Sequence, residues 1–175
     1  MKAKFLLLFF IFLFSCNSEK NIQPNVVLIY LDDLGYGDVS SYELGTLETP
    51  NMDKIANGGI RFTNGYASSA TCSPSRYALM TGTYPWRNKR AKIITGGNLI
   101  IDESEMTLPK MFKSMGYETG VVGKWHLGLG KDGPVDYNSL ISPGPNEVGF
   151  DHSYIMADTQ DRVPTVYIEN GNVVN

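Results

Sequence analysis

Two neighbouring aspartates stand where their side chains could bind a cation. Asp32 and Asp33 directly follow Asn25–Leu31, a nearly continuous run of apolar and β-branched residues. Adjacent carboxylates at the end of a buried strand are unfavourable unless a positive charge neutralises them. With no histidine nearby, the pair suits a divalent ion that prefers oxygen, Ca²⁺ or Mg²⁺. The alternative is a solvated turn in which the two side chains point apart.

Cys72 has the surroundings of a nucleophile. It precedes a predicted helix, Pro74–Met80, and Arg76 follows one turn later. A helix N-terminus and a nearby cation both favour the thiolate, and His126 could act as its base. The alternative is a structural cysteine. Sulfur is a poor ligand for a hard cation, so Cys72 and the aspartates would share a site only if an oxygen species replaced the thiol.

The elements that must position these side chains alternate between strands and helices, which favours a layered α/β fold. Apolar runs predict strands, the first of them buried on both faces, over Asn25–Leu31, Ile60–Tyr66 and Tyr117–Val122. Capping residues and apolar spacing predict helices over Asn51–Asn57, Pro74–Met80 and Leu108–Met115. A Gly/Pro-rich loop covers Gly128–Pro145, and Val163–Val174 could form a hairpin around Asn170-Gly171.

Composition excludes several classes of protein. The chain has 175 residues with 15 Lys+Arg and 18 Asp+Glu, a formal net charge of −3, and no basic run, which argues against nucleic-acid binding. A hydrophobic share of 42% and a charged share of 19% are typical of a globular protein and not of a disordered or fibrous one. With only 2 histidines, a zinc site built from imidazoles is disfavoured.

The N-terminus predicts export. A short basic region precedes Phe5–Phe14, an apolar run too short for a transmembrane helix, which takes about 20 apolar residues. Leu13–Cys16 resembles a bacterial lipobox, whose cysteine is diacylated and becomes the first residue of the mature protein. The alternative is an ordinary secretory signal. We expect an exported bacterial lipoprotein, in the periplasm or at the outer membrane or cell surface, held to the membrane by lipid on Cys16.

Two motifs resemble the signatures of the type I sulfatase family. Residues 72–82 read C-S-P-S-R-Y-A-L-M-T-G and resemble the family's C-x-P-x-R motif, while residues 116–126 match its G-Y-x-T-x-x-x-G-K-x-H motif. The segment ending in Asp32-Asp33 is similar to the family's first metal-binding segment, and Gly149–Asp151 to a looser one. The resemblance covers essentially the whole mature chain.

This resemblance implies a sulfatase reaction. In the family, the motif cysteine is oxidised by a separate maturation enzyme to Cα-formylglycine, and one hydroxyl of the hydrated aldehyde attacks the sulfur of a sulfate monoester. It implies that Cys72 becomes the nucleophile and a metal ligand. Asp32 and Asp33 would be the other metal ligands, with Ca²⁺ as the expected ion and Mg²⁺ as the alternative. An oxygen species at residue 72 removes the conflict between sulfur and a hard cation.

The resemblance also assigns roles to three cationic side chains. Arg76 would orient the diol, Lys124 would touch both the diol and the sulfate, and His126 would assist proton transfer. Lys124 and His126 are two residues apart, so an extended segment would project both to one side. The alternatives are a solvated surface lysine and a loop histidine.

The fold implied is an alkaline phosphatase-like α/β sandwich, with a central, mainly parallel sheet flanked by helices. We expect residues 1–15 to be the signal peptide, 16–23 a tether, and 24–175 the N-terminal part of the catalytic domain. Family members supply a further Asp-Asn metal pair and another Lys and His from later segments, and no such pair follows residue 126. These residues alone should therefore neither complete the cation site nor turn over well.

The expected substrate is a sulfated carbohydrate, by analogy with lipoprotein sulfatases that act on glycans. The alternatives are a phosphonate monoester or phosphodiester hydrolase of the same superfamily, a non-catalytic glycan-binding lipoprotein, and a plain Cys–His hydrolase. The polar segment with His152, Asp158, Asp161 and Arg162 could face a sugar, but we interpret it as a surface loop.

Overall fold

The computed structural model describes residues 23–42 and 47–174, which fall into two units, one ending at Leu34 and the other beginning at Gly35. Every helix and strand of the described residues belongs to the second unit: η2 (Tyr36–Asp38), η3 (Ser40–Tyr42), α2 (Pro50–Gly58), α3 (Cys72–Thr81), η4 (Pro85–Arg87), α4 (Leu108–Ser114), β1 (Gly120–Lys124), β2 (His152–Met156), β3 (Tyr167–Glu169) and β4 (Asn172–Val174). The signal peptide and Cys16 lie outside the described residues, so the expectations about them stay predictions.

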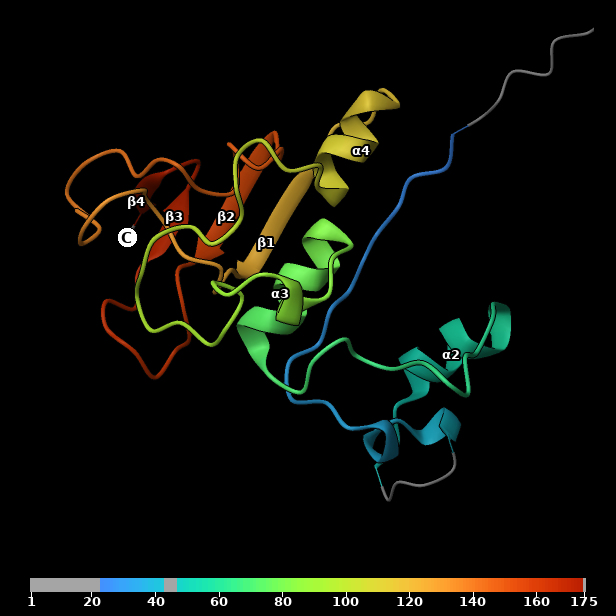
Figure 1. Ribbon diagram of the computed structural model, residues 1–175. Helices are drawn as coiled ribbons and strands as arrows, with labels where there is room; N and C mark the ends of the chain where they lie inside the picture. Colours follow the sequence, from blue (N-terminus) through green and yellow to red (C-terminus); the bar gives the residue numbers. More distant parts are fainter. Residues whose placement is uncertain (1–22, 43–46, 175) are drawn as a thin grey trace, which may run out of the picture. The chain divides into compact units, whose positions relative to one another are not determined.

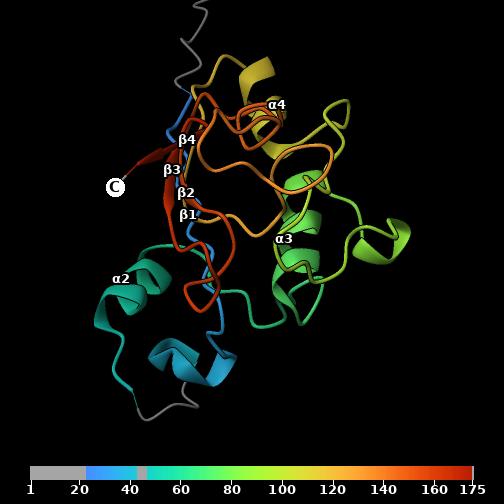
Figure 2. The ribbon, with the colours of Figure 1, turned by 90° about the vertical axis from the view of Figure 1, so that its left-hand side faces the viewer.

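The four strands form one mixed sheet in the order β1-β2-β3-β4 (Figure 1). β1 and β2 are parallel, with Gly120 opposite His152 and Lys124 opposite Met156, whereas β3 and β4 add antiparallel. Helices α3 and α4 lie on the same side of this sheet (Figure 2). The architecture is thus α/β, and the parallel pair brings the carboxyl ends of β1 and β2 to one edge.

The predicted hairpin is confirmed at the end of the chain. β3 and β4 pair with Glu169 opposite Asn172, which leaves Asn170 and Gly171 as a two-residue turn. Both turn residues have positive φ, 45° and 80° respectively, as a type I′ turn requires. The Ile141 amide donates to the Gly171 carbonyl at 2.8 Å, so the turn also anchors the long loop that precedes β2.

The three predicted helices are confirmed with small shifts at their ends. α3 begins at Cys72, two residues earlier than predicted, and ends where Gly82 adopts a left-handed conformation, with φ of 64°. The Thr107 side chain caps α4 by accepting a hydrogen bond from the Lys110 amide, as preferred N-cap residues do. Within residues 23–42 and 47–174, no helix has the length and apolar character needed to cross a membrane.

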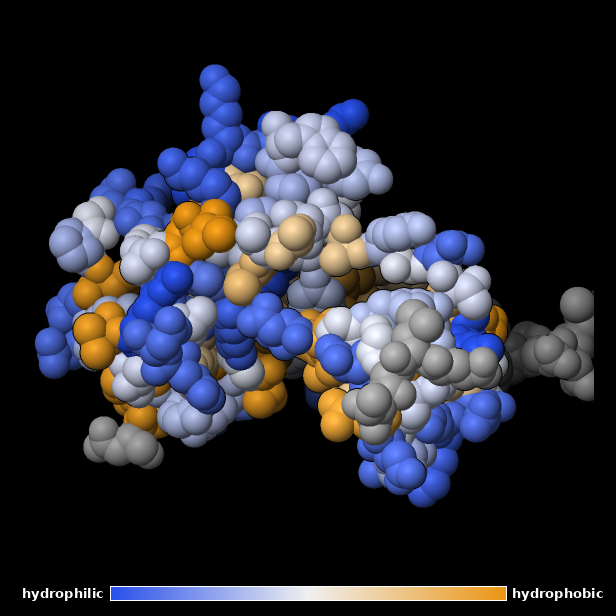
Figure 3. Space-filling view, turned by 90° about the horizontal axis from the view of Figure 1, so that it is seen from below, coloured by the Kyte–Doolittle hydropathy of each residue, from blue (hydrophilic) through white to orange (hydrophobic). Residues whose placement is uncertain are grey.

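Two predicted strands are not formed, and a third begins and ends later in the chain than predicted. Asn25–Leu31, in the first unit, is assigned no secondary structure. Ile60–Tyr66 is also irregular, and its apolar side chains add to the apolar groups scattered over the described surface (Figure 3). β1 spans Gly120–Lys124, whereas Tyr117–Val122 was predicted, and it is an edge strand in which Val122 is exposed. Apolar composition predicted these strands, but a strand forms only where a neighbour pairs with it.

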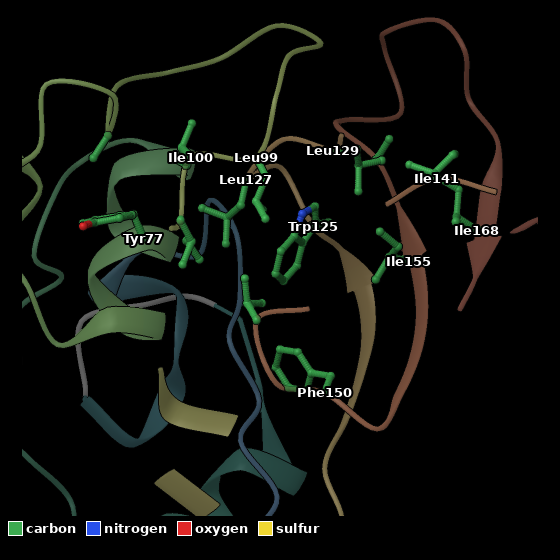
Figure 4. Close-up of a cluster of buried hydrophobic side chains, with 14 residues drawn as sticks. Tyr77, Leu99, Ile100, Trp125, Leu127, Leu129, Ile141, Phe150, Ile155 and Ile168 are labelled. Atoms are coloured by element: carbon green, nitrogen blue, oxygen red, sulfur yellow. The ribbon is translucent and has the colours of Figure 1, made fainter. Parts of the chain in front are cut away.

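The buried core lies beside the carboxyl end of β1 (Figure 4). Trp125 and Leu127, which follow β1, are 2% and 1% exposed, and Trp125 packs edge-on against Phe150 with ring centroids 6.4 Å apart. The same buried cluster includes Ile155 of β2 and Tyr77 of α3. Burying each such side chain contributes about 1.5–3 kcal/mol. The core therefore fixes the residues that follow Lys124.

Gly128 offers a test of this close packing. Its φ is +82°, and a Cβ atom there would lie 2.1 Å from the Asn98 carbonyl oxygen, whereas Gly133, with φ of +75°, has open space around it. We expect Gly133→Ala to cost about 1 kcal/mol of unfolding free energy for the left-handed backbone. Gly128→Ala should cost roughly 2–4 kcal/mol, because the clash adds to that strain. Thermal unfolding of the two variants in the full-length protein checks this, and equal losses would contradict it.

Candidate active site

Cys72 and Lys124 meet although 52 residues separate them. Cys72 is the first residue of α3 and is half-buried, and Lys124 is the last residue of β1. The Lys124 Nζ donates to the Cys72 Sγ at 3.2 Å. The fold thus places an ammonium group at the atom that the sequence marks as the nucleophile. An oxygen at the same position would meet the same donor.

Arg76 links the helix to the strand. It lies four residues after Cys72, on the same face of α3. Its Nη1 donates to the backbone carbonyl of Lys124 at 2.7 Å. Arg76 therefore holds the backbone whose side chain reaches Cys72. The predicted grouping of Cys72, Arg76 and Lys124 is present, with Arg76 bonded to Lys124.

His126 is buried in an unusual conformation. Its side chain is 1% exposed and its φ is +53°, in the left-handed region. The expectation of an extended segment through Lys124 and His126 is therefore wrong, because a φ of +53° is not extended. The His126 amide still donates to the Ala157 carbonyl at 2.8 Å, and its Nε2 bonds the Ile94 carbonyl at 2.8 Å. Contacts on both sides thus hold the residue in its strained backbone.

The bond to Ile94 decides the tautomer of His126. A carbonyl only accepts, so Nε2 carries the hydrogen, and in the neutral ring Nδ1 holds the lone pair. Nδ1 is buried without a hydrogen-bond partner among the described residues. Burial lowers the pKa of His126, with the positive charges of Lys124 and Arg162 adding to the effect, while the Ile94 bond and Asp158 oppose it. The site therefore holds a neutral imidazole with an open acceptor.

Two residues of the polar segment after β2 also belong to this site. The Arg162 Nη1 donates to the Ile94 carbonyl at 3.0 Å and lies 3.3 Å from the His126 Nε2. The Asp158 carboxylate accepts from the Gly96 amide at 2.7 Å. The interpretation of the whole segment as a surface loop is therefore wrong for Arg162 and Asp158.

The pairing of the strands carries a signal that could have found Arg162. Because β1 and β2 are parallel, the residues after each strand emerge at the same edge of the sheet. Lys124 ends β1 and His126 follows it, and Asp158 and Arg162 follow β2. A prediction that His152–Met156 pairs parallel to β1 would have placed the two polar segments together. The role of the Ile94 carbonyl cannot be predicted from the sequence, because every residue type has a backbone carbonyl.

Asp32 and Asp33 belong to the first unit, and Cys72 to the second. The φ of Asp33 is +59°, so the chain turns sharply after the extended run. Two carboxylates fit the oxygen preference of Ca²⁺ or Mg²⁺ but fill only part of a shell of about six to eight oxygens for Ca²⁺. In the described part of the chain, no group of three or more His, Cys, Asp or Glu residues could hold a metal ion. The ligand set Asp32, Asp33 and Cys72 stays a prediction.

Comparisons with known proteins agree on one family. The protein-family model described as Sulfatase matches residues 24–173. An N-acetylgalactosamine-6-O-sulfatase of Bacteroides thetaiotaomicron is 48% identical over 159 residues, which are 90% of this chain and 31% of that protein. A human steryl-sulfatase is 40% identical over 144 residues, which are 78% of this chain and 24% of that protein. The chain thus spans about a third or less of the length of these relatives.

Comparison with solved structures also finds proteins that resemble this chain. A structure from work on the metabolism of multiple glycosaminoglycans by Bacteroides thetaiotaomicron superposes with a TM-score of 0.80 at 50% identity, over 82% of this chain and 30% of that one. A second structure, in complex with its substrate D-glucosamine-2-N,6-O-disulfate, gives a TM-score of 0.56 at 31% identity, over 79% of this chain and 24% of that one.

The lowered pKa of His126 predicts a pH dependence of stability. Below a pH of about 6.5, the unfolded chain protonates this imidazole while the folded chain keeps it neutral. The unfolded state then binds more protons, so the free energy of unfolding falls as the pH falls. We expect His126→Gln to reduce this fall, because glutamine stays neutral and can still donate to Ile94. Thermal unfolding of both full-length proteins between neutral pH and mildly acid pH checks this, and parallel curves would contradict it.

Proposed function

This chain belongs to the sulfatase family, and we propose that the full-length protein hydrolyses sulfate monoesters on a carbohydrate. The observation that carries the proposal is the contact of Lys124 with Cys72. Cys72 is the first residue of α3 and belongs to the motif that resembles the family signature. This is the arrangement that an attack on an anionic ester needs, because a fixed cation stands beside the nucleophile.

The nucleophile in this proposal is residue 72 after maturation. A maturation enzyme, with an oxidant, would convert the Cys72 thiol to the formylglycine aldehyde. When hydrated, that group supplies a hydroxyl for attack and a second hydroxyl for release of sulfate. The position supports this, because Lys124 approaches the Sγ at 3.2 Å and would equally donate to an oxygen there.

The remaining side chains act on charge and protons. The Lys124 ammonium offsets negative charge on the sulfuryl oxygens, and Arg76 holds Lys124 in place through its carbonyl. The His126 Nδ1, which has a lone pair and no partner among the described residues, takes a proton from the reacting hydroxyl or returns it. His126 can accept that proton at neutral pH because its pKa is lowered.

A divalent cation completes the proposal. Asp32, Asp33 and the modified residue 72 would hold Ca²⁺, or alternatively Mg²⁺, together with ligands from other segments. When bound, the ion supplies Lewis-acid activation of the hydroxyl and of the sulfate. The donor set supports this choice because carboxylate oxygens suit hard ions.

The proposed substrate class is a 6-O-sulfated amino sugar. The bacterial relative with 48% identity is named for N-acetylgalactosamine 6-O-sulfate, and the substrate in the second solved structure also carries a 6-O-sulfate. We further propose export as a lipoprotein, supported by the apolar run Phe5–Phe14 and the lipobox-like Leu13–Cys16.

The reaction is tested with matched substrates. We expect the full-length protein, produced with a maturation enzyme, to release sulfate from N-acetylgalactosamine 6-sulfate faster than phosphate from the corresponding 6-phosphate. Cys72→Ala should lower kcat/KM by roughly 10³-fold or more, because it removes the nucleophile. A chelator should also lower the rate. Peptide mass spectrometry should find at residue 72 one oxygen in place of the sulfur and two hydrogens fewer.

Each alternative predicts a different result. Preference for the phosphate, or for phosphodiesters, would identify a phosphoryl-transfer enzyme. An unmodified Cys72 thiol in fully active protein, insensitive to a chelator, would identify a Cys–His hydrolase. Sugar binding without turnover of any ester would identify a binding lipoprotein.

The membrane anchor is tested at the other cysteine. We expect radiolabelled palmitate to label the full-length protein in a bacterial host, and Cys16→Ala to abolish this labelling because the acceptor thiol is gone. Cys72→Ala is the matched control and should remain labelled. Release of an unlabelled wild-type protein after signal cleavage would show an ordinary secretory signal instead.

A further inference from the structure

We propose that Arg162 is a positioning residue, which holds the His126 ring in the tautomer that leaves Nδ1 as the proton acceptor. This inference rests on the proposed function only in giving His126 a part in the reaction. The positioning itself stands on contacts among Arg162, Ile94 and His126, which are present in the structure whatever the substrate is.

The first step is the shared acceptor. The Ile94 carbonyl accepts from the Arg162 Nη1 at 3.0 Å and from the His126 Nε2 at 2.8 Å. A carbonyl oxygen has two lone pairs, so it serves both donors at once. The two nitrogens lie 3.3 Å apart. The 2.8 Å bond to a carbonyl requires the hydrogen on Nε2, and Arg162 acts by holding that carbonyl in place.

The second step is the fixed position of the acceptor. The segment Ile94–Gly96 is irregular, and nothing in its own secondary structure holds the Ile94 carbonyl in place. Arg162 binds it at Ile94, and the Asp158 carboxylate binds it at the Gly96 amide, at 2.7 Å. The residues after β2 therefore hold this loop at both ends.

The third step is the backbone of His126 itself. The Ala157 carbonyl accepts the His126 amide at 2.8 Å, one residue before Asp158. The same segment thus fixes the main chain of His126 directly and its ring through Ile94. With Nε2 occupied, the ring cannot flip without losing a buried hydrogen bond, which costs about 1–3 kcal/mol. Nδ1 keeps its lone pair and has no partner among the described residues.

Nearby charges also help to keep the His126 ring neutral. The charged groups that influence the His126 ring are Lys124 and Arg162, which disfavour the imidazolium, and Asp158, which favours it. Arg162 therefore both orients the ring and opposes its protonation before the reaction.

The test separates positioning from substrate binding. In the full-length protein we expect Arg162→Gln to lower kcat by roughly 10- to 100-fold, the order that a misplaced group costs, with KM changed by less than about twofold. The acid limb of the kcat profile should move to higher pH, and Arg162→Lys should restore part of the rate. Arg61→Gln is the matched control, because Arg61 also donates to a backbone carbonyl, that of Ser41, and should leave kcat unchanged.

A second readout does not depend on turnover. Nitrogen-15 NMR of labelled histidine, assigned with His126→Gln, should show one neutral tautomer with hydrogen on Nε2 in the wild type. In Arg162→Gln it should show a mixture of tautomers or a raised pKa. An unchanged tautomer and pKa would overturn the proposal, and a raised KM alone would make Arg162 a substrate ligand. If the wild type hydrolyses no sulfate ester, the proposed function fails, while the NMR result still decides the role of Arg162.

Discussion

The parallel pairing of β1 with β2 is the constraint on which the site depends. It places Lys124 opposite Met156, and the pairing continues past the strands, where the Trp125 and His126 amides donate to the carbonyls of Met156 and Ala157. Two polar segments, which follow β1 and β2, must therefore emerge side by side. A shift of one residue in this register would move each side chain to the opposite face and separate them.

A second link brings the nucleophile to that edge. Two hydrogen bonds join α3 to β1. Arg76 of α3 donates to the Lys124 carbonyl, and the Lys124 side chain of β1 donates to the Cys72 Sγ. The buried Trp125 lies directly after this junction. Because protein interiors are close-packed, such a junction has little freedom to open or slide. The arrangement thus presents a cation to residue 72 without requiring a large movement when an anion binds.

Local signals predicted the parts of the fold that depend on few residues. Asn170-Gly171 determines the hairpin turn, and Gly82 ends α3, because each acts through its own backbone conformation. The strand predicted over Asn25–Leu31 depends on partners, which an apolar run does not specify. In the same way, the motifs placed Cys72, Arg76 and Lys124 together. Arg162 and Ile94 are 68 residues apart, and their contact uses a backbone carbonyl. No residue pattern could predict it, because every residue type has such a carbonyl.

His126 carries two energetic costs, in its backbone and at its buried nitrogen. A left-handed backbone at a residue other than glycine costs about 1–3 kcal/mol, and a buried acceptor without a partner costs about as much again. Both occur at His126, where Nδ1 has no partner among the described residues. A glycine would relieve the backbone and a leucine would fill the space, so stability alone would favour neither the imidazole nor its open nitrogen. The buried core around Trp125 offsets these costs, and the proton-accepting role that we propose for His126 would account for them.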